Sequence, residues 1–160
     1  MSDKKLHTVF ESLGEEETMR FAQEVGEQAE AGDVICLSGE LGAGKTRFVK
    51  GFVRAFGLDP REVTSPTFTI IQEYEGTLPI YHFDCYRIEK IEEVLEIGAE
   101  EYFYGEGVSI IEWPKKISAI VPEHALWIDI EVTGKNSRTF TLKKMQNETK
   151  NLTQRHGNPE

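Results

Sequence analysis

The feature that most constrains this chain is a glycine-rich segment that fits the pattern GxxxxGK[ST]. The segment reads Gly39-Glu40-Leu41-Gly42-Ala43-Gly44-Lys45-Thr46. The apolar residues 34–37 before it predict a strand buried on both faces. Residues 45–56 after it place their bulky apolar side chains on one face of a predicted helix. A glycine-rich loop between a strand and a helix is the setting in which this pattern cradles phosphates.

Each residue type in this loop suits phosphate chemistry. Gly39, Gly42 and Gly44 permit a backbone whose N–H groups point inward at phosphate oxygens. The following helix adds its positive N-terminal dipole. Lys45 would reach the β- and γ-phosphates of a nucleoside triphosphate, and the Thr46 hydroxyl would coordinate Mg²⁺. The other interpretation is a glycine-rich turn that only joins a strand to a helix.

Two acidic residues follow apolar strand-like runs and are candidates for the rest of the site. Asp84 comes after residues 80–83, and Glu112 comes after residues 108–111. Ligands of α/β proteins gather at the carboxyl ends of strands, so we predict that Asp84 holds Mg²⁺. Glu112 would polarise the attacking water, join the Mg²⁺ shell, or both. The alternatives are an Asp84 on the exposed face of an edge strand and a Glu112 that is a surface acid.

A hydroxyl-rich segment precedes the third predicted strand. Ser65, Pro66 and Thr67 occupy the position where P-loop proteins carry a nucleotide-sensing switch. Hydroxyls there can approach the γ-phosphate and the metal. The alternative is an ordinary turn that Pro66 fixes.

Three further residues have weaker signals. His82 has no partner at a metal-binding spacing, so we interpret it as structural. Trp113, directly after Glu112, is either a core residue or a contact residue. Arg138 follows the last turn and is a candidate for a contact near the base or the sugar.

The periodicity of the remaining chain predicts one α/β domain. Ser12 and Glu15 form a capping box that would open a helix. The predicted fold is a P-loop NTPase-like three-layer sandwich with a mixed, mostly buried sheet. Residues 1–145 would form the domain, and residues 146–160 a polar, disordered tail. Strands are expected at 8–13, 34–37, 68–75, 80–87, 107–113, 126–132 and 138–142, and helices at 12–29, 45–56 and 88–97.

The composition limits the partners. Lys and Arg number 18 against 28 Asp and Glu, a net charge of −10, so a general affinity for nucleic-acid phosphates is not expected. No apolar run approaches the roughly 18 residues of a membrane span, and the N-terminus lacks the apolar centre of a signal peptide. Cys36 and Cys85 lie far apart in apolar runs and are interpreted as buried thiols. These features favour a cytoplasmic protein.

Four motifs in order give the chain a specific resemblance. They are GELGAGKT at residues 39–46, SPTF at 65–68, HFDCYR at 82–87 and IIEWP at 110–114. Together they resemble the TsaE family, also called YjeE, of bacterial P-loop ATPases. The resemblance covers roughly residues 6–145. Cys85 stands where the family more often has Leu.

The resemblance implies a role in making threonylcarbamoyladenosine at position 37 of certain tRNAs. TsaE proteins bind the TsaB–TsaD heterodimer, and their ATP hydrolysis supports repeated turnover, so tRNA would be met only through that complex. The resemblance also implies residue roles. Thr46 and Asp84 would bind Mg²⁺, Glu112 would act at the metal or its water, residues 65–67 would be the switch, and Trp113 would face the partner.

Three other functions share the phosphate loop. A small-molecule or nucleoside kinase should carry an Arg-rich lid, but Arg87 is the only Arg between Arg61 and Arg138. A GTP-dependent switch should read guanine with an Asn/Thr-Lys-x-Asp segment, and none is present. A nucleotide-gated binding module with negligible hydrolysis cannot be separated from a slow ATPase by sequence.

Overall fold

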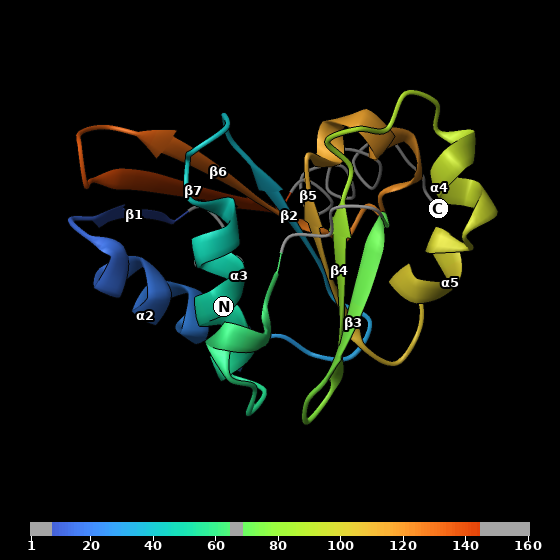
Figure 1. Ribbon diagram of the computed structural model, residues 1–160, viewed down its shortest axis with the longest axis horizontal. Coiled ribbons are helices and arrows are strands. Elements are labelled where there is room, and N and C mark those ends of the chain that lie inside the picture. Colours follow the sequence, from blue (N-terminus) through green and yellow to red (C-terminus); the bar gives the residue numbers. More distant parts are fainter. Residues whose placement is uncertain (1–7, 65–68, 145–160) are drawn as a thin grey trace, which may run out of the picture.

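One mixed sheet organises the structure. The computed structural model describes residues 8–64 and 69–144. The strands of these residues follow the order β1-β7-β6-β2-β5-β4-β3 across the sheet (Figure 1). In chain order they are β1 (Val9–Ser12), β2 (Val34–Ser38), β3 (Ile71–Glu75), β4 (Pro79–Asp84), β5 (Val108–Glu112), β6 (Leu126–Val132) and β7 (Arg138–Lys144).

The centre of the sheet is parallel and its edges are antiparallel. Strands β6, β2, β5 and β4 run parallel to one another. Strand β7 pairs antiparallel with both β6 and β1, and β3 pairs antiparallel with β4. Strands β2 and β5 are buried along nearly their whole length, as expected for central parallel strands covered on both faces. The strands expected at 68–75 and 80–87 lie next to each other as an antiparallel hairpin, because only a short turn separates them.

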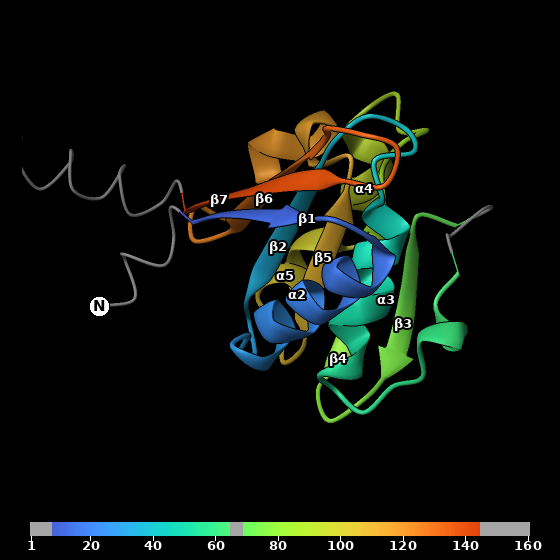
Figure 2. The same cartoon turned by 90° about the vertical axis from the view of Figure 1, so that its left-hand side faces the viewer.

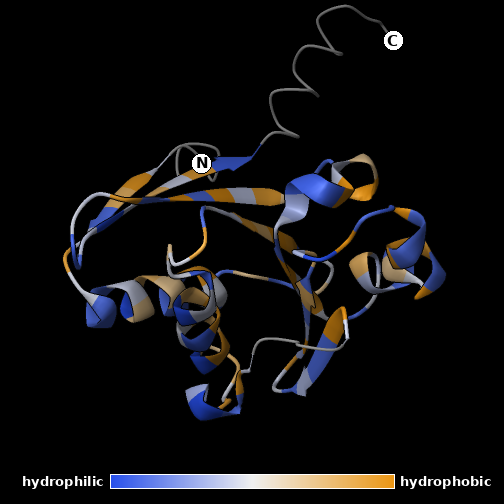
Figure 3. Cartoon of the chain, turned by 45° about the horizontal axis from the view of Figure 1, so that its top comes forward, coloured by the Kyte–Doolittle hydropathy of each residue, from blue (hydrophilic) through white to orange (hydrophobic). Residues whose placement is uncertain are grey.

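Helices cover both faces of the sheet and make three layers (Figures 1 and 2). Helices α2 (Glu15–Glu27) and α3 (Lys45–Arg54) pack on one face, where they share a hydrophobic cluster with β2, β5, β6 and β7. Helices α4 (Glu92–Glu96) and α5 (Ala99–Phe103) and the 3₁₀ segment η2 (Pro114–Ile120) share a second cluster on the other face. Figure 3 shows that apolar and polar residues alternate along the helices, and the buried apolar residues of α2 and α3 belong to the cluster against the sheet. The predicted three-layer α/β fold is confirmed.

Two helical glycines explain how closely α2 and α3 approach each other. A Cβ atom at Gly51 would lie 2.4 Å from the carbonyl oxygen of Met19. A Cβ atom at Gly26 would lie 2.8 Å from the Cβ of Ala55. Glycine weakens an isolated helix, but here it removes the side chain that would separate the two helices. The two helices therefore pack closely side by side within the same hydrophobic cluster.

The predicted start of the first helix is wrong. The capping box at Ser12 and Glu15 does not form, because Ser12 pairs with Arg138 as the last residue of β1. The Ser12 hydroxyl is buried and lies 2.8 Å from the Thr18 hydroxyl. The helix begins at Glu15 after Gly14, and the Leu13 N–H is bound by the Glu17 carboxylate at 2.9 Å. Strand pairing thus displaced the cap that the local pattern favoured.

Other boundaries also differ from the predicted ranges. Strand β4 ends at Asp84 rather than at residue 87, because the Asp84 carboxylate accepts the Tyr86 N–H in a turn at 3.0 Å. Strand β3 begins only at Ile71. The helix predicted at 88–97 is the shorter α4, and α5 follows it after Gly98, whose φ of 77° ends the first helix. The predicted tail at 146–160 lies outside the described residues. None of the helices within residues 8–64 and 69–144 has the length and apolar character of a membrane span.

Candidate nucleotide-binding site

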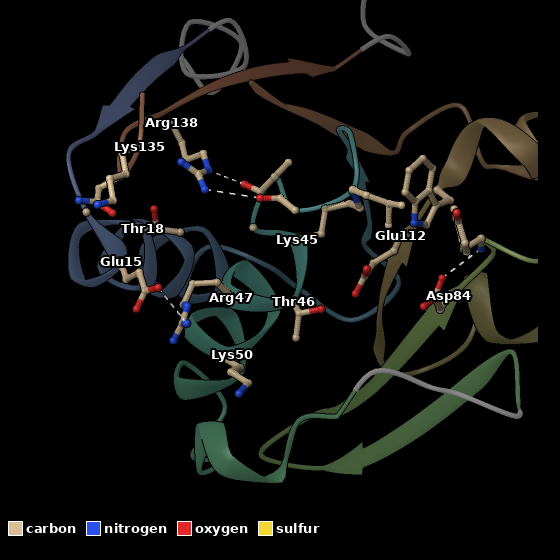
Figure 4. A pocket seen from close by; sticks show the side chains of 18 residues that line it. Glu15, Thr18, Lys45, Thr46, Arg47, Lys50, Asp84, Glu112, Lys135 and Arg138 are labelled. Atoms are coloured by element: carbon tan, nitrogen blue, oxygen red, sulfur yellow. Dashed lines mark hydrogen bonds and ion pairs between the residues drawn. The ribbon is translucent and has the colours of Figure 1, made fainter. Parts of the chain in front are cut away.

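The carboxyl ends of three parallel strands meet beside the glycine-rich loop. Asp84 at the end of β4 is the register partner of Glu112 at the end of β5, and Glu112 pairs on its other side with Leu37 of β2. A cavity of about 470 Å³ opens at this edge of the sheet (Figure 4). The cavity is lined by residues 41–46 of the loop together with Asp84, Glu112, Trp113 and Arg138.

The loop has the backbone that its glycines predict. Gly42 and Gly44 have φ angles of 80° and 108°, in the region that residues with a side chain rarely adopt. A Cβ atom at Gly39 would lie 2.8 Å from the Ile130 carbonyl oxygen, so this glycine lets the loop pack against β6. Helix α3 starts at Lys45, and Lys45, Thr46 and Arg47 of its first turn line the cavity.

Lys45 is buried and held by its own loop. Its Nζ donates to the carbonyls of Gly39 at 2.7 Å and Glu40 at 2.9 Å. The ammonium also lies 4.1 Å from the centre of the Trp113 ring, a cation–π distance. Burial lowers the pKa of Lys45, although the nearby carboxylates of Glu112 and Asp84 oppose that shift. The single ammonium of the loop therefore already shares the cavity with both acids.

Both acids lie where the strand-end argument predicts them. Strand β4 lies between β5 and β3, so the alternative of an edge strand for Asp84 is wrong. Glu112 is only 4% exposed, so the alternative of a surface acid is wrong as well. Burial raises the pKa of Asp84, Glu112 adds to that rise, and the Tyr86 N–H and Lys45 oppose it. The two carboxylates thus lie together beside the glycine-rich loop.

His82 has a contact that its sequence position did not reveal. Its Nε2 lies 2.8 Å from Oε2 of Glu112, and the imidazole is fully buried. His82 and Asp84 are two residues apart on β4, so their side chains lie on the same face of the sheet. The two-residue spacing from Asp84 was the signal in the sequence that could have placed His82 at the site. The hydrogen bond of His82 to Glu112 could not be read from the sequence, because it depends on which strand lies next to β4.

Trp113 joins the cavity to a second hollow. Its backbone has a φ of 60°, which is uncommon for a bulky residue and marks local strain beside Glu112. Its ring packs 4.9 Å from that of Tyr86. Trp113 is half-buried and also lines a neighbouring groove of about 500 Å³ with Leu41 and Pro114.

Arg138 at the start of β7 binds backbone carbonyls of the glycine-rich loop. Its Nε donates to the Ala43 carbonyl at 2.9 Å and its Nη1 to the Ser137 carbonyl at 2.9 Å. The sequence predicts a contact of this residue with the base or the sugar. In the structure its guanidinium binds backbone carbonyls of the glycine-rich loop, at the end of the cavity away from Asp84 (Figure 4).

Several lining residues carried no local signal. They come from the β1–α2 junction, helix α3 and the β6–β7 turn, which only the sheet order brings together. Among them, Arg47 and Glu15 form an ion pair of 3.1 Å. The lining residues from these elements are Gly14, Glu15, Thr18, Arg47, Lys50, Lys135 and Asn136, and Tyr86 after β4 also lines the cavity. The predicted switch residues Ser65, Pro66 and Thr67 lie outside the described residues.

The donor set defines which metal the cavity could hold. Within the described parts of the chain, no group of three or more His, Cys, Asp or Glu residues is arranged for a metal ion. Asp84, Glu112 and the Thr46 hydroxyl would offer hard oxygen ligands. Mg²⁺ is commonly held in this way, by one or two carboxylates with phosphates and water completing the shell.

Comparison with known families agrees with this geometry. The profile of the family described as "Threonylcarbamoyl adenosine biosynthesis protein TsaE" matches residues 13–140. This chain belongs to the TsaE family. The match runs from the β1–α2 junction to β7 and so contains the loop, both acids and Trp113.

Individual TsaE proteins are similar over most of their length. The protein named tRNA threonylcarbamoyladenosine biosynthesis protein TsaE from Bacillus subtilis is 44% identical over 137 residues, 85% of each chain. The protein of that name from Treponema pallidum is 40% identical over 131 residues, 82% of this chain and 96% of its own. The crystal structure of Bacillus subtilis YdiB matches with a TM-score of 0.73 and 37% identity, covering 91% of this chain and 90% of YdiB.

Proposed function

We propose that this TsaE-family chain binds ATP with Mg²⁺ and hydrolyses it slowly. Its role would be the threonylcarbamoyladenosine modification of tRNA at position 37, performed in the cytoplasm through the TsaB–TsaD complex. The observation that carries the proposal is the convergence of Lys45, Asp84 and Glu112 on one cavity beside the phosphate loop.

The phosphates would bind where the loop and the start of α3 face the cavity. N–H groups at the start of the helix would bind an anion there, and the helix dipole would add to the attraction. Lys45 would exchange at least one of its bonds to the carbonyls of Gly39 and Glu40 for a phosphate oxygen. Mg²⁺ would be held by Thr46 and Asp84 and would neutralise charge on the terminal phosphates. Glu112 would orient the attacking water, join the Mg²⁺ shell, or both.

Slow hydrolysis by the chain alone follows from its arginines. Among the residues that the structure describes, the two arginines that line the cavity are Arg47, which pairs with Glu15, and Arg138, which is bound to backbone carbonyls. Neither is positioned by these contacts to stabilise charge on a terminal phosphate. An arginine supplied by a partner is worth about 10³–10⁵ in rate in some P-loop enzymes, so stimulation by TsaB–TsaD is expected.

The groove beside the loop supports a partner-facing role for Trp113. Leu41 is 67% exposed and Tyr86 is 42% exposed, and both line this groove with Trp113. An exposed apolar surface of this kind is typical of a protein interface. Since Trp113 also contacts Lys45, a partner bound there would lie next to the phosphate site.

We expect Thr46→Ala and Asp84→Asn to weaken ATP binding more in the presence of Mg²⁺ than in its absence. Each substitution removes a hard oxygen that the metal would use. ATP titrations with Mg²⁺ and with a chelator measure the difference. Asp129→Asn is the matched control, because Asp129 is exposed on β6 and does not line the cavity. An unchanged Mg²⁺ requirement in either test variant would remove that residue from the metal shell.

The protein alone should bind tRNA poorly at physiological salt. A net charge of −10 leaves few phosphate contacts and therefore little release of counterions. A gel-shift titration at about 0.15 M salt measures this affinity. Tight binding by the isolated chain would contradict an indirect contact with tRNA through the complex.

The proposed function is tested by measuring phosphate release from ATP with and without the TsaB–TsaD heterodimer. Slow release that the heterodimer accelerates is the expected result. Tight ATP binding without release in either condition would indicate a nucleotide-gated binding module. Transfer of the γ-phosphate to a small acceptor would indicate a kinase, and preference for GTP in competition would indicate a different nucleotide.

A further inference from the structure

A chain of buried hydrogen bonds runs behind Glu112, away from the phosphate loop. Oε2 of Glu112 lies 2.8 Å from Nε2 of His82. The other ring nitrogen, Nδ1, lies 3.2 Å from the Tyr74 hydroxyl. Exposed fractions are 4% for Glu112, 0% for His82 and 8% for Tyr74. Three polar side chains from β5, β4 and β3 are thus connected across neighbouring strands.

The positions of the hydrogens in this series of hydrogen bonds follow from which atoms can only accept. A carboxylate only accepts, so with ionised Glu112 the hydrogen of a neutral His82 must lie on Nε2. Nδ1 then needs a donor, because an unsatisfied polar atom in the interior is costly. Tyr74 is the residue whose hydroxyl reaches it.

The Tyr74 hydroxyl has two other acceptors within reach, but these acceptors can be satisfied by other donors or by water. It lies 3.2 Å from the Thr64 carbonyl and 3.3 Å from Oε1 of Gln72. Oε1 of Gln72 already accepts the Thr64 hydroxyl at 3.0 Å, and Thr64 is exposed to water. For Nδ1 of the fully buried His82, Tyr74 is the one donor within residues 8–64 and 69–144, so the hydroxyl hydrogen belongs there.

We propose that His82 is a positioning residue for Glu112 and that Tyr74 fixes the imidazole for that task. The Nε2–H holds Oε2 of the carboxylate, which leaves Oε1 for the cavity side. In Figure 4 the carboxylates of Glu112 and Asp84 face the space beside Lys45 and Thr46. This inference rests on the proposed ATPase activity, in which Glu112 orients the attacking water.

A positioning role makes a prediction that a purely structural role does not. A carboxylate that loses its orienting donor can turn about its own side-chain bonds and spends less time aligned with the water. Turnover at saturating ATP should then fall, while ATP affinity, which depends mainly on the loop and Lys45, should not.

The matched variants are His82→Gln and His82→Asn. The amide nitrogen of Gln can take the place of Nε2 and donate to Glu112, whereas the shorter Asn reaches only the place of Nδ1. We expect turnover of His82→Asn to fall by about 10- to 100-fold, the range typical for partners that orient a site residue. His82→Gln should recover most of the activity. His124→Asn is the control, because His124 bonds to the Gly32 carbonyl outside the cavity.

Tyr74→Phe tests the second bond of the chain. It keeps the ring but removes the donor to Nδ1, so a smaller loss of turnover is expected with unchanged ATP affinity. Thermal unfolding of each variant checks that the protein is folded.

A direct measurement on the unmodified protein does not depend on activity or on variant stability. Nitrogen-15 NMR of the imidazoles distinguishes the two neutral tautomers, and the His82 signal is assigned by its loss in His82→Gln. The proposal requires hydrogen on Nε2 in the wild type. Hydrogen only on Nδ1 would overturn it.

The kinetic outcomes separate this inference from the proposed function. Wild-type turnover that survives in His82→Asn but is lost in Glu112→Ala would overturn the positioning role and leave the ATPase intact. Equal losses in His82→Asn and His82→Gln would also overturn it, because the donor would then be irrelevant. Absence of hydrolysis by the wild type, with and without the heterodimer, would contradict the proposed ATPase, while the tautomer would still test the placement of the hydrogen.

Discussion

Lys45→Ala is expected to weaken ATP binding by at least about a hundredfold, which is about 2.7 kcal/mol of binding free energy. Lys45 is the one ammonium that the loop itself places in the cavity, and its attraction to a phosphate is stronger in a partly enclosed site than in bulk water. Isothermal titration of wild type and variant with ATP and Mg²⁺ measures the change. Affinity within a few-fold of the wild type would contradict the assignment of the phosphate site.

The control for this experiment must remove a charge of the same kind from elsewhere. Lys143→Ala does so on the exposed face of β7, and its ATP affinity should match the wild type. Lys45 also bonds to the Gly39 and Glu40 carbonyls, so the alanine variant loosens the loop as well. Lys45→Arg keeps a charge but changes its shape, and a large loss there too would show that the compact ammonium is needed.

The glycine-rich loop was the part of the site whose conformation the local sequence predicted most fully. Its glycines, the apolar strand before it and the amphipathic helix after it all lie within residues 34–56. The positive φ angles of Gly42 and Gly44 are what that pattern requires. Asp84 and Glu112 could be placed at the same edge because parallel strands end together, although their direct register pairing depends on the sheet order.

The missed features depend on contacts that are distant in sequence. His82 was interpreted as structural because its neighbours in the chain offer no metal site, but its partner Glu112 is 30 residues away. Arg138 reaches the Ala43 carbonyl, 95 residues away, because β7 and the loop lie at the same edge. The capping box at Ser12 failed for the same kind of reason, since strand pairing with Arg138 took precedence over a local cap.

The catalytic prediction concerns Glu112, whose carboxylate would orient water for in-line attack on the γ-phosphorus. Glu112→Ala should retain ATP but lose turnover, and the loss should be clearest with TsaB–TsaD present. Positioned proton acceptors contribute about 10²–10⁴-fold, which is the expected loss. If Glu112 also binds Mg²⁺, ATP affinity falls too, so phosphate release must be measured at saturating ATP for each protein, alone and with the heterodimer.

A second variant, Glu112→Gln, separates the loss of the catalytic carboxylate from a loss of folding stability. Alanine at position 112 leaves the buried Nε2–H of His82 without its acceptor, which costs about 1–3 kcal/mol of folding free energy. Glu112→Gln keeps an acceptor for that hydrogen and removes only the carboxylate, so it should be as inactive as alanine but more stable. Glu100→Gln, on the exposed side of α5, is the control for a lost charge. Full partner-stimulated turnover in Glu112→Gln would remove the carboxylate from the mechanism, because the amide cannot accept a proton from the attacking water.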